Sequence, residues 1–262
     1  MQSYKIVKTS YANLFASNSF KAEIVTQALL WDRLDVISKD NNWFKVKSKD
    51  GYIAWVHKFY LVDSEIYDSD EFFSNKVNWY WIVHPLLDLS SDNKSLFLSF
   101  GTCVPCILDK DDIFLVLPDS EKVEISKEFI LNCNISYCIE DVVEYGKSLL
   151  GIPYMWGGKS SFGFDCSGLI QTLFNVAGMV LPRDCSMQIT SNSLKKIEIT
   201  DLRTGDLVYF ADNGKVDHVG IFVNQSEYLH SSGYVKINSI NCDTFNYDLN
   251  LYNKIKGFYR AI

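Results

Sequence analysis

Long apolar runs, glycine and proline are scarce in this sequence. Its hydrophobic stretches are short and interrupted, as over residues 112–117, so the ~20 consecutive apolar residues that a membrane-spanning helix needs are missing. Only 14 Gly and 5 Pro stand among 262 residues, 47% of which are hydrophobic, and this composition excludes a disordered or fibrous chain. The sequence therefore predicts a folded protein with no membrane partner and with room for two or three domains.

Basic residues are in the minority as well. The 25 Lys and Arg against 32 Asp and Glu leave a net charge of −7. A nucleic-acid partner is therefore not expected, because such binding needs a basic face that neutralises phosphates. The charge is uneven, since residues 1–62 carry nine basic and five acidic side chains whereas the remainder is acidic. This asymmetry indicates separate modules.

A disulfide framework is not indicated either. Seven cysteines are an odd number in a chain that is long enough to fold without cross-links, so we expect reduced thiols. Residues 1–15 lack the apolar core of about 7–15 residues that a secretory leader places behind its positive charge. We therefore expect a cytoplasmic protein, or an exported one if a leader has been removed. We also expect the protein to be a monomer.

The first 62 residues predict a small β-barrel. Polar and apolar residues alternate over 43–48 with the period of a half-buried strand, and the turn residues at 40–42 and 50–51 suit tight hairpins. The acidic, polar stretch 63–75 predicts a linker. Weaker strand-like runs between 77 and 131 predict a second small β-module.

The hydrophobic period changes near residue 140. Apolar residues over 140–150 recur at helical spacing and stop at Gly151, a residue that readily takes the left-handed conformation at a helix end. A loop over 152–164 follows, and then a helix over 167–178 with one apolar face. Strand-like runs fill the remainder, so the region has an α+β pattern.

One cysteine and two histidines suit a thiol nucleophile with its proton shuttle. Cys166 stands at the expected start of the 167–178 helix, where free N–H groups and the helix dipole stabilise a thiolate and can hold an oxyanion. His218 and His230, two of only four histidines, fall on neighbouring expected strands. Taken alone, each of these residues is more often structural than catalytic, but together they stand in the order that a papain-type site uses. We expect both imidazoles to face the start of a helix packed across the sheet.

Several motifs over residues 140–262 resemble the NlpC family of cell-wall cysteine peptidases. The matching segments are YMWGG (154–158), FDCSGL (164–169), LPRD (181–184), GDLV (205–208), DHVGI (217–221) and LH (229–230). The resemblance implies that Cys166 is the nucleophile, His218 the general base and His230 the third, orienting residue. The implied chemistry needs no cofactor and no metal.

The same resemblance implies contacts to a peptide substrate. Tyr154 matches a tyrosine that lines the site and helps to hold the oxyanion, and Asp165, Ser167 and Asp184 match substrate-binding positions. The chain departs from the family at the next position, where Cys185 stands in place of a serine. Because a thiol is a poorer hydrogen-bond partner than a hydroxyl, this departure puts one substrate contact in doubt.

The N-terminal part resembles the first bacterial SH3-like domain of family members that recycle murein peptides. The matching segments are residues 22–30 and 50–56. By this resemblance Glu23 binds the free amine of an N-terminal L-alanine and Tyr52 or Tyr60 assists, because a carboxylate is the natural counter-charge for an ammonium. Glu23 is equally well explained as a solvent-exposed carboxylate on a strand that has no role in substrate binding.

The implied fold class is α+β, with a papain-like catalytic domain preceded by two small SH3-like β-barrels. The first SH3-like domain covers residues 1–62, the linker and second SH3-like domain cover 63–138, and the peptidase domain covers 139–262. The implied reaction is hydrolysis of the amide between γ-D-glutamate and diaminopimelate or lysine in murein peptides with a free N-terminal L-alanine, which releases L-Ala-D-Glu. The alternatives are an exported endopeptidase that acts on intact peptidoglycan and a non-catalytic wall-binding protein with a vestigial peptidase domain.

Four further thiols gather around the second predicted module. Cys103 and Cys106 form one pair and Cys133 and Cys138 another, and two such pairs can build a structural zinc site. The second spacing is loose and the residues around Cys106 are strand-like, which favours buried free thiols. We therefore expect no metal.

Overall fold

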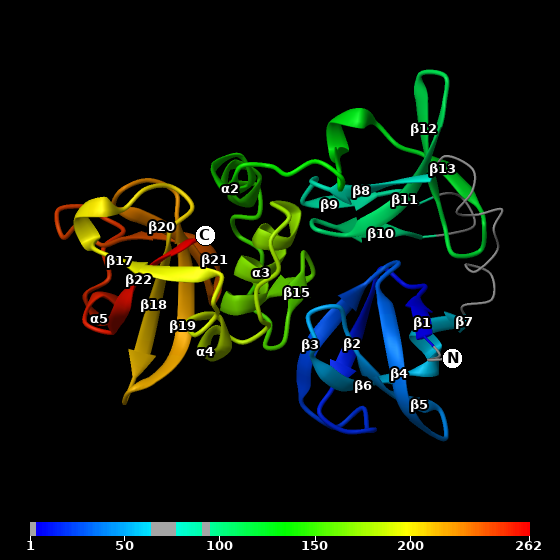
Figure 1. Ribbon diagram of the computed structural model, residues 1–262, viewed down its shortest axis with the longest axis horizontal. Helices are drawn as coiled ribbons and strands as arrows, with labels where there is room; N and C mark the ends of the chain where they lie inside the picture. The colour runs from blue at the N-terminus through cyan, green and yellow to red at the C-terminus, as the bar shows by residue number, and fades with distance from the viewer. Residues whose placement is uncertain (1–3, 64–76, 91–94) are drawn as a thin grey trace. The chain divides into compact units, whose positions relative to one another are not determined.

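The computed structural model describes residues 4–63, 77–90 and 95–262. The chain forms two compact units, Met1–Ser136 and Tyr137–Ile262 (Figure 1). All but the first residue of the predicted linker 63–75 lies outside the described residues. The three-domain division with boundaries at 62 and 138 stays a prediction.

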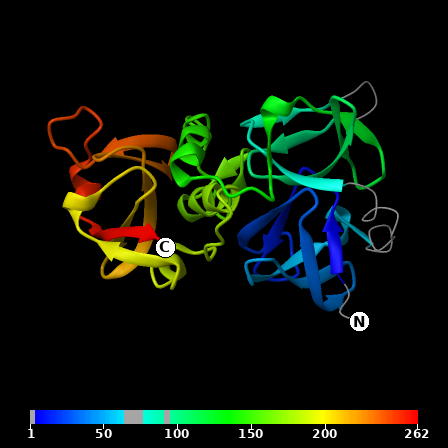
Figure 2. The same cartoon turned by 45° about the horizontal axis from the view of Figure 1, so that its top comes forward.

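Short antiparallel strands build the first part of the N-terminal unit (Figure 2). The predicted alternation is present, because Phe44 and Val46 are buried while Trp43 and Lys45 are partly exposed. The seven strands pair in the order β3-β2-β6-β5-β4-β1-β7. Their bounds are β1 (Tyr4–Val7), β2 (Tyr11–Phe15), β3 (Ile24–Leu29), β4 (Arg33–Asp40), β5 (Trp43–Lys47), β6 (Ile53–His57) and β7 (Leu61–Asp63), with a 3-10 turn at Lys58–Tyr60.

The sheet is open where the sequence predicted a closed barrel. Its edge strands are β3 and β7, and no ladder joins them within the described residues. Strand β7 has only three residues, and the ladder between β2 and β3 shifts register next to Phe15. Short strands and bulges terminate a sheet rather than continue it.

A second sheet shares its core with the first part of the unit. Trp31 packs among its buried residues, donates its indole N–H to the carbonyl of Val116 at 2.9 Å and stacks edge-on against Trp79. The two β-modules are therefore one packed body. The second sheet runs β13-β12-β11-β8-β14 beside the hairpin β10-β9. The bounds are β8 (Val77–Ile82), β9 (Leu86–Asp88), β10 (Phe97–Ser99), β11 (Cys103–Asp109), β12 (Asp112–Val116), β13 (Lys122–Glu124) and β14 (Ile130–Asn132), with a 3-10 turn at Lys127–Phe129.

The four thiols considered for zinc do not converge. The sulfurs of Cys103 and Cys133 lie 3.1 Å apart, whereas Cys106 is buried in the core and Cys138 is exposed. In the described parts of the chain, no three His, Cys, Asp or Glu residues are grouped to hold a metal ion.

The C-terminal unit has the α+β pattern that the sequence predicted. The helices are α2 (Ile139–Lys147), α3 (Cys166–Val176) and the short α4 (Cys185–Gln188) and α5 (Leu249–Tyr252). As expected, glycines follow the two longer helices in the left-handed region, since φ is 87° at both Gly151 and Gly178. No helix within the described ranges is long and apolar enough to span a membrane.

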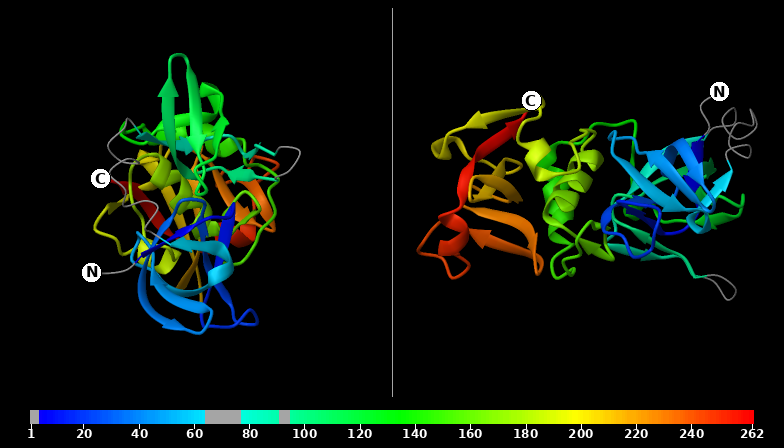
Figure 3. Two further views of the ribbon diagram at one scale, coloured as in Figure 1. Left: turned by 90° about the vertical axis from the view of Figure 1, so that its right-hand side faces the viewer. Right: turned by 90° about the horizontal axis from the view of Figure 1, so that it is seen from below.

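A six-stranded sheet completes this unit, in the order β17-β22-β18-β19-β20-β21. Helices α2 and α3 lie against one of its faces (Figure 3), where a Cβ added at Gly146 of α2 would stand 3.0 Å from Leu173 and 3.3 Å from Leu229. The other face carries an aromatic cluster with Phe210, Phe222 and Tyr228. The strands are β17 (Leu194–Ile197), β18 (Leu207–Asp212), β19 (Lys215–Phe222), β20 (Glu227–Ser232), β21 (Tyr234–Ser239) and β22 (Ile255–Ala261), and the two-stranded β15 (Lys159–Ser160) and β16 (Gly163–Phe164) precede α3.

Candidate active site

Cys166 is the first residue of α3, at the helix start that the sequence predicted. The preceding Asp165 caps the helix, because its Oδ1 accepts the main-chain N–H of Gly168 at 2.7 Å. The Cys166 thiol is buried and donates to the main-chain oxygen of Asp217 at 3.8 Å. Free N–H groups of the first turn and the positive end of the helix dipole therefore lie at the sulfur, where they can stabilise negative charge.

A buried ion pair holds this helix cap. Arg183, only 2% exposed, donates to both carboxylate oxygens of Asp165 and, through Nη1, to Oγ of Ser167 at 3.0 Å. Burial alone would lower the pKa of Arg183, but the Asp165 carboxylate raises it and keeps the guanidinium charged. Two predicted substrate contacts, Asp165 and Ser167, thus also belong to the structure that fixes Cys166.

The two histidines meet on neighbouring strands. The ladder between β19 and β20 contains only two registered pairs, and Nε2 of His218 lies 2.8 Å from Nδ1 of His230 just beyond it. Gly220 leaves room for this contact, since a Cβ there would stand 2.7 Å from the ring of Tyr228 and 3.3 Å from Cβ of His230. The predicted approach of His218 and His230 is therefore present in the fold.

A β-bulge brings α3 to the histidines. Phe210 of β18 pairs with His218 and Ala211 pairs with Val216, so Asp217 is the extra residue of β19. A bulge leaves a main-chain group without a ladder partner and redirects the neighbouring side chains. Here the carbonyl of Asp217 accepts the thiol of Cys166.

This arrangement corrects one sequence-based expectation. His218 and His230 share the face of the aromatic cluster, with His218 5.4 Å from Phe210 and His230 5.1 Å from Tyr228 between ring centroids. That face is opposite the one covered by the bodies of α2 and α3, so the helices do not pack over the imidazoles as expected. Cys166 instead reaches His218 at the bulge, where their hydrogen bond acts to lower the pKa of the thiol.

His230 is fully buried and continues the hydrogen-bonded chain. Its Nε2 lies 2.7 Å from Oδ1 of Asn238 on β21. Burial, and secondarily the neighbouring His218, lowers the pKa of His230 to about 3. The ring is therefore neutral at the pH where a cysteine peptidase of this kind would act.

We expect the buried His230 to make the protein sensitive to acid. Its pKa is about 3 in the folded chain, against 6.5 for an ordinary histidine. Between these values the unfolded chain binds a proton that the folded chain does not, so stability falls as the pH drops below about 6.5. Urea unfolding at pH 7 and pH 4.5 should show a larger loss in the wild type than in His230→Asn. An equal loss in both proteins would contradict this assignment.

Tyr154 is tied to the same corner of the unit. Its main-chain N–H donates to the carbonyl of Gly233 at 2.9 Å, and its side chain lines a pocket with His218. Burial raises the pKa of Tyr154, and the nearby Cys166 raises it further. The phenol therefore stays protonated and is available as a hydrogen-bond donor. The full lining is Tyr154, Phe210, Asp217, His218, Ser231, Ser232, Gly233, Leu251 and Lys254.

Cys185 places a second thiol against the first. It begins α4 directly after Asp184, and its thiol donates to the main-chain oxygen of Val216 at 3.7 Å. A hydrogen bond with Cys185, together with burial, raises the pKa of Cys166 beyond what His218 offsets, and the same bond lowers the pKa of Cys185. The free thiol of Cys166 is thus neutral until His218 takes its proton.

We expect Cys185→Ser to lower the pKa of Cys166, because a hydroxyl does not ionise and can only donate to or accept from the thiol. The pH dependence of Cys166 alkylation by iodoacetamide, followed by peptide mass spectrometry, measures this value. The midpoint should move to lower pH in Cys185→Ser and stay in place in Cys242→Ser, which alters an exposed thiol. A midpoint that stays or rises in Cys185→Ser would refute the coupling of the two thiols.

The residues predicted for the substrate amine lie in the other unit. Glu23 is exposed immediately before β3, and Tyr52 and Tyr60 pack against the core of the first sheet. Their predicted contact with substrate stays a prediction.

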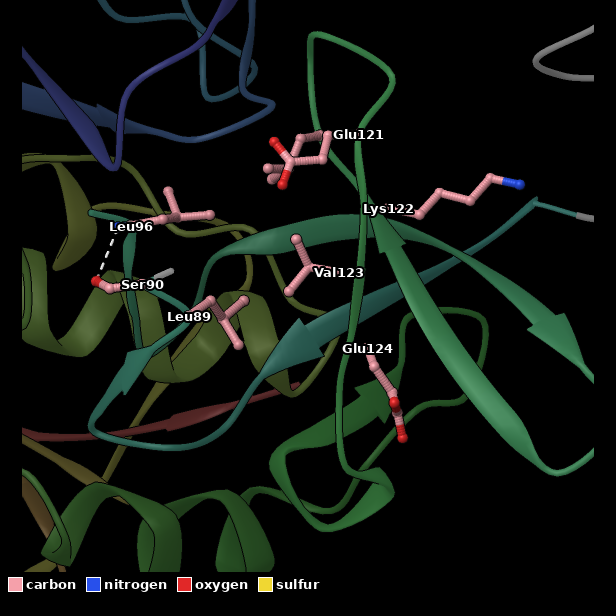
Figure 4. A pocket seen from close by; sticks show the side chains of 8 residues that line it. Leu89, Ser90, Leu96, Glu121, Lys122, Val123 and Glu124 are labelled. Carbon is pink, nitrogen blue, oxygen red and sulfur yellow. Dashed lines mark hydrogen bonds between the residues drawn. The ribbon is translucent and has the colours of Figure 1, made fainter. Parts of the chain in front are cut away.

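A pocket of the N-terminal unit offers different chemistry (Figure 4). Within it Ser90 accepts the main-chain N–H of Leu96 at 3.1 Å. The described residues that line it include neither a thiol nor an imidazole, so this pocket lacks the groups that cysteine chemistry needs. They are Leu89, Ser90, Leu96, Leu117, Glu121, Lys122, Val123 and Glu124.

Three polar residues around the site were not identified from the sequence. Arg183 lies inside a recognised motif, but its ion-pair partner Asp165 stands 18 residues earlier in the sequence, and Asn238 lies in no motif. Gln188, fully buried, donates to the carbonyls of Pro182 at 2.9 Å and Ser167 at 3.3 Å. It accepts from the hydroxyl of Tyr209 at 3.4 Å, so it joins α4 to both α3 and the sheet.

Comparison with known proteins places this geometry in a family. The model of the NlpC/P60 family matches residues 151–253 and that of the bacterial SH3 domain matches residues 10–62. A gamma-D-glutamyl-L-lysine dipeptidyl-peptidase of Bacillus cereus (strain ATCC 10987 / NRS 248) is 32% identical over 83% of this chain and 69% of its own length. A protein of the same name from Bacillus subtilis (strain 168) is 30% identical over 79% of this chain and 72% of its own length.

A solved structure agrees on the fold. The crystal structure of an NlpC/P60 family protein from Bacillus cereus ATCC 10987 superposes with a TM-score of 0.83 over 98% of this chain and 99% of that one, at 23% identity. A thiol at a capped helix start, two hydrogen-bonded imidazoles and these relatives lead to one conclusion: the chain belongs to the NlpC/P60 family and is a cysteine peptidase.

Proposed function

We propose that this protein hydrolyses the amide bond between γ-D-glutamate and the following L-lysine or diaminopimelate in murein peptides with a free N-terminal L-alanine, releasing L-Ala-D-Glu. The observation that carries the proposal is the 2.8 Å contact of His218 with His230 beside the helix start of Cys166. The names of the two relatives, which cover most of this chain at about 30% identity, support the choice of bond. The free thiols suit released peptides in a reducing cytoplasm.

In the reaction Cys166 is the nucleophile and His218 carries the proton, while His230 orients His218. His218 takes the proton of Cys166 as the sulfur attacks the γ-carbonyl carbon, and the oxyanion is held by the N–H groups at the start of α3 and by the phenol of Tyr154. The imidazolium of His218 then protonates the leaving amine, which departs and leaves a thioester. His218 deprotonates a water molecule that attacks the thioester, and the proton returns to the sulfur of Cys166.

Ser167, Asp184 and Cys185 are proposed contacts to the substrate. The Ser167 hydroxyl directs its hydrogen to Asp165 at 3.3 Å and accepts from Arg183, so it offers the substrate an acceptor lone pair. Asp165 itself is already engaged by the helix N-terminus and by Arg183. Its proposed role is therefore to fix the nucleophile as well as to add negative charge near a substrate ammonium.

We expect the enzyme to discriminate against a blocked amine. Cleavage of L-Ala-γ-D-Glu-L-Lys, followed by chromatography of the released dipeptide, should exceed that of its N-acetyl analogue by about tenfold or more in kcat/KM, since a charge-assisted pair with Glu23 contributes roughly 1.5–3 kcal/mol. Glu23→Gln should lower the value for the free peptide only, and Glu121→Gln in the same unit should lower neither. Equal cleavage of both peptides would contradict the proposed specificity for a free amine. Cleavage of intact sacculi would favour the alternative of a wall-remodelling endopeptidase.

A further inference from the structure

Asn238 lies beyond every motif that identified the site, yet its side chain contacts His230. It stands on β21 directly opposite Tyr228 of β20, which makes it the diagonal neighbour of His230 on the same sheet face. Its side-chain oxygen is 2.7 Å from Nε2 of His230, and its Nδ2 is 2.7 Å from the main-chain oxygen of Asn246. The chain of polar contacts thus extends past the third residue of the triad.

The two contacts leave the Asn238 amide one orientation. The carbonyl of Asn246 can only accept a hydrogen bond, so the group that faces it must be the NH2 end of the amide. The oxygen of Asn238 therefore faces His230, and an amide oxygen can only accept. Asn246 is held in turn, because its own Nδ2 donates to Glu227 at 2.9 Å.

The orientation of Asn238 dictates where His230 carries its hydrogen. Nε2 of His230 must be the donor to the Asn238 oxygen. Two other neighbours of His230 do not offer an acceptor to Nε2–H. Lys236 pairs with His230 across the ladder but can only donate, and Tyr228 presents its ring, 5.1 Å away between centroids. Since the buried ring is neutral, its Nδ1 has no hydrogen and acts as an acceptor.

The tautomer of His230 in turn determines the tautomer of the general base, His218. The bare Nδ1 of His230 is 2.8 Å from Nε2 of His218, so His218 must donate through Nε2. A neutral His218 then has its lone pair on Nδ1, the ring nitrogen that remains for the thiol of Cys166. The opposite tautomer would present an N–H to the sulfur and could not remove its proton.

We propose that Asn238 is a positioning residue that fixes the tautomers of His230 and His218, so that Nδ1 of His218 is the atom that accepts the proton of Cys166. The inference rests on the proposed peptidase function but concerns a residue that touches neither substrate nor sulfur. Without the acceptor at position 238, Nε2–H of His230 is buried without a partner and the ring is free to exchange tautomers. When His230 carries its hydrogen on Nδ1, that hydrogen opposes Nε2–H of His218. In these molecules His218 shifts to the tautomer that cannot take the proton of Cys166.

Nitrogen-15 NMR of histidine-labelled protein tests this directly. The chain has only four histidines, and the signals of two of them are assigned by their loss in His218→Asn and His230→Asn. At neutral pH the wild type should show Nε2 protonated and Nδ1 bare in both rings. A hydrogen on Nδ1 of either ring in the wild type overturns the proposal, whatever the variants do and whether or not the peptide is cleaved.

Variants of Asn238 supply the second readout. Asn238→Leu should give mixed tautomers and a kcat lower by about 10- to 100-fold, the range usual for outer partners of functional imidazoles, with KM within about twofold. Asn238→Asp keeps an acceptor and should keep Nε2–H on His230, and Asn192→Leu, an exposed position of the same unit, should match the wild type. Unchanged tautomers in Asn238→Leu overturn the proposal. Correct tautomers in a wild type that cleaves no murein peptide would sink the proposed function alone.

Discussion

Cys166→Ala will abolish peptide hydrolysis and leave the fold intact. The substitution removes the atom that forms the thioester, and the nearby hydroxyl of Ser167 is held by Asp165 and Arg183. We expect the release of dipeptide to fall by at least about 10⁴-fold, since groups that act as one catalytic unit lose nearly everything when the nucleophile is removed. Chromatography of the products measures the activity, and circular dichroism with thermal unfolding measures the fold.

Cys185→Ala is the matched control for this prediction. It deletes the same atom from the neighbouring buried thiol, which contacts Cys166 but has no covalent role in the reaction. We expect this variant to retain most of its kcat. Turnover that persists in Cys166→Ala would revive the alternative in which the peptidase domain is vestigial and the protein only binds the wall.

Local sequence patterns were sufficient to predict the elements that carry the nucleophile. Helix α3 begins at Cys166 because Asp165 is a good N-cap and the residues behind it are apolar on one face. The left-handed Gly178 directly follows the C-cap of α3, and the left-handed Gly151 closes the turn that follows α2. These features depend on neighbours within a few residues, which is why reading the sequence finds them.

Features that depend on residues distant in sequence could not be predicted from these local patterns. The bulge at Asp217 exists only relative to the register of β18, so the alternation of the strand alone could not show that the Asp217 carbonyl meets the thiol of Cys166. Trp31 fills the core of the second sheet, so the sharing of one core by both β-modules was invisible in separate stretches of sequence. Asn238 meets His230 only because β20 and β21 pair in one particular register.

The pairing of Asp165 with Arg183 is another feature that depends on residues distant in sequence. A family resemblance identifies this carboxylate as a substrate contact, whereas the structure shows it shared between the helix N-terminus and Arg183. Residues 165 and 183 are far apart in sequence, and nothing local indicates that the arginine is buried. The energetic importance of the pair therefore became apparent only from the fold.

Arg183→Met will be the most destabilising single substitution near the site. Methionine keeps the apolar stem of the side chain but leaves the Asp165 carboxylate, which is 9% exposed, without its counter-charge. Removing one partner of a buried pair costs about 3–5 kcal/mol, because the remaining charge stays desolvated. Urea unfolding at neutral pH measures the loss, and alkylation of Cys166 reports whether the helix start has moved. We expect both a lower midpoint and an altered alkylation rate.

Arg260→Met separates the effect on the site from the loss of an ion pair as such. Arg260 also donates to both oxygens of a buried carboxylate, that of Asp206, but its side chain is 20% exposed and the pair lies between β22 and the loop before β18. Water can reach this pair, so its loss should destabilise the protein less than the loss of Arg183 and should leave the alkylation rate of Cys166 unchanged. If Arg183→Met were no more destabilising than Arg260→Met and alkylated Cys166 at the wild-type rate, the buried pair with Asp165 would not be what holds the nucleophile in place.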